Sequence, residues 1–147
     1  MILQYGIYPQ PLGSVGVSRV DVRDIAELAA IALTQDGHAG KSYEVVGPRA
    51  VTGPETAKIW GEALGRTIAY GGDDLEAWEK ASLQYLPAWM VYDYKLMYAH
   101  FQKEGLRGTD EEVATMTRGL GHAPRSFEAY VAETAKAWQA EGAATRS

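Results

Sequence analysis

Asp21 and Asp24 are the carboxylates of this sequence best placed to take part in acid–base catalysis. They lie three residues apart where a helix is expected to begin. Carboxylates at a helix N-terminus accept hydrogen bonds from its exposed N–H groups. Arg23 lies between them and offers a charged partner. We therefore expect both carboxylates to be structural, with catalysis as the alternative.

The three histidines, His38, His100 and His122, are far apart and show no metal-ligand spacing, so we expect no metal site. His100 is a candidate general acid or base near neutral pH, with Tyr98 as its hydroxyl partner, and a solvated histidine is the alternative. His122 lies in a glycine-rich loop before Pro124 and is a candidate for the mouth of a pocket.

A strongly aromatic helix is expected over residues 87–104, because proline suits a first helical turn and Gly105 can end the helix. Aromatic walls that carry tyrosine hydroxyls are typical of small-molecule clefts. The same residue types are enriched in interfaces, so a core or dimer interface is the competing interpretation. The candidate binding residues are Tyr8, Trp89, Met90, Tyr92, Tyr94, Met97, Tyr98 and His122.

The elements that must position these side chains are organised around residues 17–33. Residues 17–22 alternate apolar and polar side chains, which is typical of a short strand. The spacing then becomes helical and predicts one apolar stripe. The residues of this stripe are Ile25, Leu28, Ala29 and Ala32.

Capping and turn residues mark the other elements. Thr52 and Glu55 form a capping box at the start of a helix that Gly65 ends. The remaining expectations are an extended segment at 2–8, strands at 41–46 and 67–70, and helices from Asp73 or Asp74, over 87–104, from Thr109 and over 126–140.

These elements predict an α/β fold, or α+β for the chain as a stand-alone piece. Short, mostly parallel strands alternate with helices and are followed by an all-helical C-terminal lobe. We expect one domain, with the strand-and-helix part at residues 1–72, the helical lobe at 73–141 and a frayed tail at 142–147.

Composition excludes several classes of function. The 147 residues are 46% apolar, which is typical of a globular domain, and the net charge of −5 shows no basic footprint for nucleic acid. Without cysteine there is no disulfide, thiolate metal site or thiol nucleophile. No apolar run is long enough for a membrane span, and no secretory signal is recognisable. We expect a soluble cytoplasmic protein.

Familiar catalytic motifs are missing from the sequence. It has no G-x-G-x-x-G turn for a dinucleotide, no Walker A lysine and no G-x-S-x-G elbow. Tyr92 and Lys95 have the wrong spacing for a Tyr-x-x-x-Lys pair.

Five segments in the same order resemble the NmrA-like proteins, atypical members of the short-chain dehydrogenase/reductase superfamily. Together they reach across almost the whole chain. The segments are VDVRDIAE at 20–27, HAGKSYE at 38–44, Gly47-Pro48 with Val51-Thr52, ALGR at 63–66, and PRSFE at 124–128 with Tyr130, Val131 and Trp138.

The resemblance is to the C-terminal half of that family. It implies the last strands of a Rossmann-type sheet and a substrate-side lobe, without the glycine-rich turn that binds NADP in the family. No cofactor residue can be carried over, so we expect no cofactor to be bound by this chain alone. An incomplete sheet leaves edges and faces exposed, which predicts a homodimer through the exposed sheet edge or face.

Three hypotheses of function follow. The first is a small-molecule-binding domain, derived from an NmrA-like NAD(P)-dependent reductase, with its ligand between the aromatic helix and the sheet. The second is one part of an NADP-dependent oxidoreductase whose Rossmann half is missing or supplied by another chain. The third is a cofactor-free hydrolase or isomerase that uses the aromatic pocket.

Overall fold

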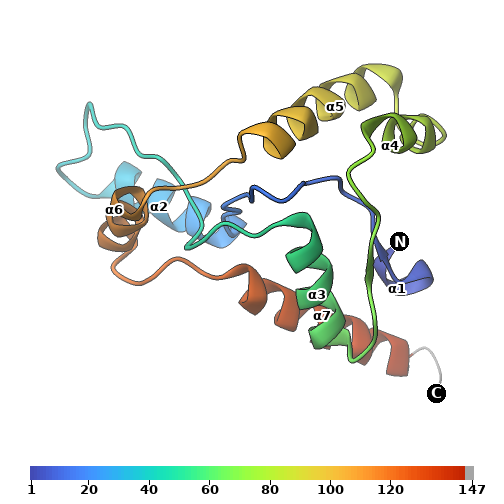
Figure 1. The fold of residues 1–147 in the computed structure, drawn as a ribbon. Coiled ribbons are helices and arrows are strands. Elements are labelled where there is room, and N and C mark those ends of the chain that lie inside the picture. The colour runs from blue at the N-terminus through green and yellow to red at the C-terminus, as the bar shows by residue number, and fades with distance from the viewer. Residues whose placement is uncertain (145–147) are drawn as a thin grey trace. The chain divides into compact units, whose positions relative to one another are not determined.

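The structure is a computed structural model that describes residues 1–144 (Figure 1). Its contacts divide the chain into two compact units. The first unit consists of residues 1–17 and 51–106, and the second of residues 18–50 and those from 107 onward. The single domain that we expect from the sequence stays a prediction. No helix in the described residues is long and apolar enough to cross a membrane.

The first unit contains a small parallel sheet. Strands β1 (Ile7–Tyr8) and β2 (Ala69–Tyr70) pair with Ile7 opposite Ala69. Parallel strands need a crossover connection. Helix α3 (Gly53–Leu64) precedes β2 in the chain and packs against both strands. The predicted α/β class is thereby confirmed.

Helix α3 begins and ends where the local signals place it. The hydroxyl of Thr52 accepts a hydrogen bond from the backbone N–H of Glu55 at 3.2 Å, and the Glu55 carboxylate accepts one from the N–H of Thr52. Gly65 ends the helix in the left-handed conformation, at φ 64°. Ile59 and Trp60 of this helix are buried.

Helices α4 (Leu75–Ser82) and α5 (Ala88–Lys103) pack together in the first unit (Figure 1). The rings of Trp78 and Tyr98 meet edge to face with their centroids 5.0 Å apart. Lys95 of α5 forms an ion pair with Glu79 of α4 at 2.6 Å. One side of α5 is therefore held against α4, which leaves other aromatic side chains of α5 exposed.

The second unit is helical in the described residues. Leu28, Met116 and Leu120 form its buried cluster, and Val20, Tyr43 and Val46 pack against it. Its helices are α2 (Val22–Thr34), α6 (Asp110–Leu120) and α7 (Phe127–Ala144). Helix α6 begins at a second capping box, in which the hydroxyl of Thr109 accepts from the N–H of Glu112.

Two predicted strands are wrong. Of residues 17–22, only Val17 pairs, through single bridges to Val51 and Leu106, and residues 41–46 form no strand. A strand needs a neighbour about 4.8 Å away to complete its hydrogen-bond ladder. Residues 41–46 instead use Tyr43 and Val46 to pack against the helical cluster.

The N-terminal segment and the inner face of α2 also differ from the prediction. Residues 2–8 are not extended throughout, because the short helix α1 (Ile2–Tyr5) precedes β1. On α2 the buried residues are Asp24 and Leu28, whereas Ile25 and Ala29 are exposed. Asp24 is buried because it has an ion-pair partner, which a count of apolar positions does not detect.

Helix α7 is longer than predicted and continues to Ala144 instead of ending near Ala140. Val131 and Ala135 are buried, whereas Tyr130, which helical spacing also places on the inner stripe, is 46% exposed. Of the tail predicted to fray at 142–147, residues 142–144 are helical backbone and residues 145–147 lie outside the described residues.

Candidate functional site

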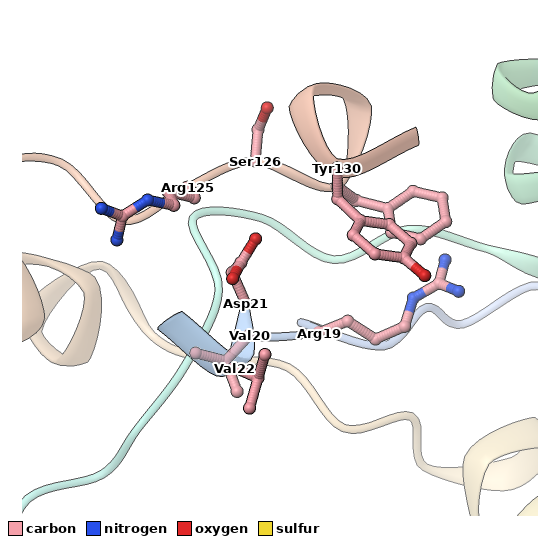
Figure 2. A pocket seen from close by; sticks show the side chains of 8 residues that line it. Arg19, Val20, Asp21, Val22, Arg125, Ser126 and Tyr130 are labelled. Atoms are coloured by element: carbon pink, nitrogen blue, oxygen red, sulfur yellow. The ribbon is translucent and has the colours of Figure 1, made fainter. Parts of the chain in front are cut away.

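A small cavity lies in the second unit between the start of α7 and the segment that leads into α2 (Figure 2). Residues 19–22, 125–127 and Tyr130 line it, and we call it the α7 cleft. Its volume is about 260 Å³. This is near the lower limit of ligand pockets, and it fits a molecule of one or two rings.

Local interactions hold both walls of the α7 cleft. The hydroxyl of Ser126 accepts a hydrogen bond from the backbone N–H of Ala129 at 3.1 Å, which caps the first turn of α7. On the facing segment, the guanidinium carbon of Arg19 lies 3.7 Å from the centroid of the Phe127 ring. This is a cation–π contact. It joins the two walls.

Asp21 is the N-cap of α2, as predicted, and contributes a carboxylate to the cleft. It accepts from the backbone N–H of Arg23 at 2.9 Å and from the guanidinium of Arg23 at 2.9 and 2.7 Å. Its side chain is 4% exposed. The hydrogen bonds from Arg23 lower the pKa of Asp21, so this carboxylate is ionised and already paired at neutral pH.

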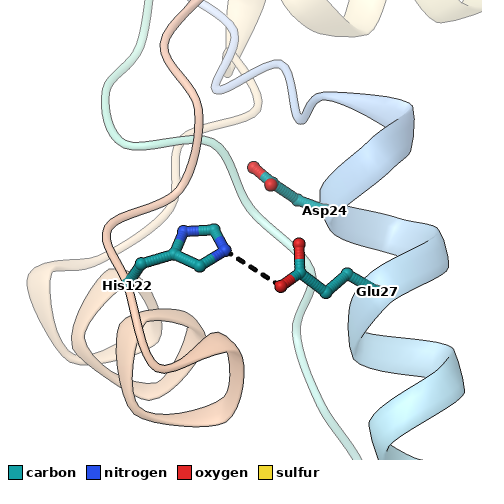
Figure 3. A group of neighbouring side chains, drawn as sticks. All are labelled: Asp24, Glu27 and His122. Atoms are coloured by element: carbon teal, nitrogen blue, oxygen red, sulfur yellow. Dashed lines mark hydrogen bonds and ion pairs between the residues drawn. The ribbon is translucent and has the colours of Figure 1, made fainter.

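Next to the cleft, a charged cluster joins α2 to the loop before α7 (Figure 3). The carboxylate of Asp24 is fully buried and accepts from the backbone N–H of Arg125 at 2.7 Å and from its guanidinium. Arg125 also reaches Glu27 at 3.2 Å. The Nε2 atom of His122 lies 3.1 Å from the other Glu27 carboxylate oxygen.

The cluster shifts the pKa values of its members in opposite directions. The backbone carbonyl of Ala123, and after it Glu27, raises the pKa of His122 above its usual 6.5. Hydrogen bonds from His122 and then Arg125 lower the pKa of Glu27. Both changes favour the ionised forms, so the charges stabilise one another.

The ligand atoms of Asp24, Glu27 and His122 lie within 4.8 Å of one another, a grouping that could hold a metal ion. Arg125 already supplies positive charge to both carboxylates. The arrangement therefore works as an ion-pair cluster. Sequence reasoning missed it because Glu27 and His122 are 95 residues apart, and the only local signal was the spacing of Asp24 and Glu27 on one helix face.

The predicted binding residues of α5 fall on different sides of the helix. Trp89 is 65% exposed and Tyr92 is 60% exposed, and Tyr94 is exposed as well. Met90 and Met97 are half-buried. Tyr98 is buried against Trp78. The structure thus presents three aromatic rings to solvent, and their binding role stays a prediction.

The other predicted residues lie apart from that exposed group. Tyr8 is buried on β1, where its hydroxyl bonds to Gln10. His122 belongs to the charged cluster of the second unit. His100 is exposed, and its ring centroid lies 6.4 Å from that of Phe101. Burial raises the pKa of Tyr98 to about 12, so its hydroxyl keeps its proton at neutral pH.

No model of a known protein family matches the chain. The chain is 35% identical to an NAD(P)H azoreductase of Xenophilus azovorans over 137 residues, which are 92% of this chain and 46% of that protein. It is 32% identical to a (4-alkanoyl-5-oxo-2,5-dihydrofuran-3-yl)methyl phosphate reductase of Streptomyces griseus, over 92% of this chain and 47% of that one. The chain spans about half the length of these curated relatives.

Solved structures of reductases share the fold. An NADPH-dependent quinone oxidoreductase of Escherichia coli superposes with a TM-score of 0.80 over 90% of this chain and 47% of its own, at 21% identity. A triphenylmethane reductase of Citrobacter sp. gives 0.76 over 88% of this chain and 44% of its own, also at 21% identity. The predicted resemblance to part of an NmrA-like reductase is confirmed.

Proposed function

We propose that this chain is the small-molecule-binding part of an NAD(P)H-dependent reductase, without a dinucleotide site of its own. The observation that carries the proposal is its similarity, over 92% of its length, to two proteins named as reductases. In such enzymes the nicotinamide supplies a hydride. The part played by this chain is to bind and orient the molecule that accepts it.

The connection from β2 to α4 is the place in the first unit where a strand leads directly into a helix. Its residues support the proposal that the dinucleotide is not bound by this chain. The residues between β2 and α4 are Gly71, Gly72, Asp73 and Asp74, so two carboxylates follow the two glycines at the start of the helix. Asp73 accepts from the N–H of Gly13 at 2.8 Å, and Asp74 accepts from the N–H of Ala77 at 2.9 Å. A pyrophosphate would need such N–H groups and would be repelled by the carboxylates.

The exposed rings of Trp89 and Tyr92, three residues apart on one face of α5, support a flat, conjugated ligand. Rings on a helix surface can stack against such a molecule, and tyrosine hydroxyls can orient a carbonyl or similar acceptor. The name of one relative and the name of one structural neighbour agree in kind, since they specify azo and quinone compounds.

Two titrations of the purified chain test the proposal. With menadione, a naphthoquinone, as the probe, we expect saturable quenching of tryptophan fluorescence. The affinity should fall about tenfold in Trp89→Ala and stay unchanged in Tyr85→Ala, an exposed aromatic residue outside α5. With NADPH, calorimetry should give only the heat of dilution. Saturable NADPH binding at micromolar concentration, or menadione binding that is indifferent to Trp89, would contradict the proposal.

The proposal includes a homodimer that works in the cytoplasm. The two-residue strands leave sheet edges without a neighbour in the described residues, and α5 exposes several aromatic rings. Open sheet edges and apolar patches of this kind favour association.

A further inference from the structure

The second unit contains a further pocket, between the loop that follows α2 and the C-terminal part of α6. We call it the α6 pocket, and its volume of about 480 Å³ lies within the range of small-molecule sites. Most of the side chains that line it are polar, and none of these described residues carries a carboxylate. They are His38 and residues 41–43 of the loop, with Thr115, Arg118 and Gly119 of α6.

Local contacts hold the loop wall of the α6 pocket. The Nδ1 atom of His38 lies 2.7 Å from the hydroxyl oxygen of Tyr43, and the backbone N–H of Lys41 donates to the carbonyl of His38 at 3.1 Å. The side chain of Tyr43 also packs against the buried cluster of the second unit. The loop is therefore held beside α6 although it is neither helix nor strand.

The loop wall presents hydrogen-bond donors that the described part of the chain does not use. The ammonium of Lys41 and the hydroxyl of Ser42 have no partner in the described residues, and both side chains are exposed. When the hydroxyl of Tyr43 donates to Nδ1 of His38, the hydrogen of this imidazole is on Nε2. His38 then supplies a third donor.

The facing wall adds a guanidinium whose donors are only partly used. The Nη2 atom of Arg118 donates to the Glu111 carboxylate and to the Thr115 hydroxyl, both at 2.9 Å. The N–H groups on its Nε and Nη1 atoms make no bond within the described residues. The side chains of Arg118 and Glu111 are 64% and 81% exposed, so water screens this ion pair. Arg118 and Lys41 therefore keep the pocket positively charged.

A phosphate monoester matches these donors. It carries a charge of about −1.5 to −2 at neutral pH and three terminal acceptor oxygens. Arginine forms paired hydrogen bonds to phosphate oxygens, and lysine binds them as a point charge. A carboxylate has a single charge and two oxygens, and would leave more of these donors without a partner. The half-buried ring of Tyr43 provides an apolar surface for the organic part of the ester.

We propose that the α6 pocket binds a small phosphate monoester. Lys41, Ser42 and Arg118 bond to the phosphate oxygens, and the organic group lies against the ring of Tyr43. The pocket belongs to the second unit, whereas α5 belongs to the first. The proposal therefore does not depend on the reductase role proposed above.

Calorimetry with three probes tests this site. Phenyl phosphate is the ester, phenyl sulfate has the same shape with a single negative charge, and inorganic phosphate lacks the organic group. We expect phenyl phosphate to bind at one site per chain, about tenfold more tightly than phenyl sulfate, and more weakly as salt is raised. Equal affinity for phenyl phosphate and phenyl sulfate would overturn the proposal. Inorganic phosphate that binds as tightly as phenyl phosphate would overturn the assignment to an ester.

Three single variants locate the binding of phenyl phosphate. Lys41→Gln should weaken it about tenfold. Lys136→Gln is the matched control and should leave it unchanged, because it removes an exposed charge of α7 that does not line the pocket. Glu111→Gln removes the carboxylate that competes for Arg118 and should strengthen binding about threefold.

Two results with these variants would overturn the proposal. One is an equal loss of affinity in Lys41→Gln and Lys136→Gln, which would indicate attraction by the overall charge alone. The other is an affinity unchanged in both Lys41→Gln and Glu111→Gln. Trp89→Ala separates this site from the one proposed on α5, since it should weaken menadione binding and leave phenyl phosphate binding unchanged.

Discussion

Asp24 shows how one residue can have a different role from the one its position indicates. It stands in the first turn of α2, where a carboxylate normally faces solvent and the exposed N–H groups. Here it is fully buried, and its oxygens accept from both the backbone and the guanidinium of Arg125. It thereby ties α2 to the loop before α7, which forms one side of the α7 cleft.

Asp24→Asn should destabilise the second unit by roughly 2–3 kcal/mol, because the variant keeps an acceptor but loses the charge that balances Arg125. Urea unfolding followed by circular dichroism measures the change. Asp36→Asn, at an exposed loop carboxylate, is the matched control and should have no effect. Equal midpoints for the two variants would show that the ion pair contributes nothing.

The His122–Glu27 pair should make stability depend on pH. The pKa of His122 is raised above 6.5 in the folded chain, so its contribution is complete below pH 6.5 and is lost as the pH rises through the folded pKa. The pKa of Glu27 is lowered below 4.5, so its contribution is present above pH 4.5 and is lost as the pH falls through its folded value. The pair is therefore strongest between about pH 4.5 and 6.5.

We expect the urea midpoint of the wild-type chain to decrease as the pH is raised from 6.0 to 9.0. The decrease should be smaller in His122→Asn. The exposed His100 supplies the control, since His100→Asn should follow the wild-type profile. If His122→Asn and the wild type lose stability in parallel over this range, the pair does not act as described.

At the scale of elements, close backbone contacts matter as much as helix propensity. Gly47 lies against the chain at Arg19, and a Cβ atom at this position would overlap the Arg19 carbonyl oxygen. Its N–H also donates to the carbonyl of Ser18. The close backbone contact of Gly47 with Ser18 and Arg19 positions the segment that forms one wall of the α7 cleft.

Gly47→Ala should cost about 3 kcal/mol or more and disturb the cleft, because backbone cannot move aside as a flexible side chain can. Gly65→Ala is the contrasting variant. Gly65 has open space for a Cβ atom but a φ of +64°, so only backbone strain of about 1–2 kcal/mol is expected. Thermal unfolding compares the two, and a Gly47→Ala variant as stable as Gly65→Ala would refute the close contact.

For the molecule as a whole, the exposed apolar side chains are the main feature to explain. Trp89, Tyr92 and Leu96 of α5 are exposed, and so is Leu83 at the end of α4. Large apolar patches on soluble proteins mark sites of binding or association. These exposed side chains therefore support both the proposed ligand contact and the proposed dimer interface.

Sedimentation equilibrium should give twice the 16.0 kDa chain mass at micromolar concentration, because the exposed edges and rings favour a second copy. The double variant Trp89→Ser/Tyr92→Ser tests whether α5 forms the interface. If α5 does, this variant should have a mass closer to that of the monomer. If the wild-type chain remains at the single-chain mass throughout the concentration range, the homodimer is excluded.

The sequence by itself determined the features that depend on nearby residues. The capping box at Thr52, the helix start at Thr109, the Asp21 cap and the stop at Gly65 were predictable because a cap joins residues two or three positions apart. The resemblance to a reductase was also readable, since it rests on short ordered segments. Tertiary structure decided the rest. Residues 41–46 have strand composition but no neighbouring strand to pair with, and the burial of Asp24 and the position of His122 depend on partners about a hundred residues away, which no local pattern can specify.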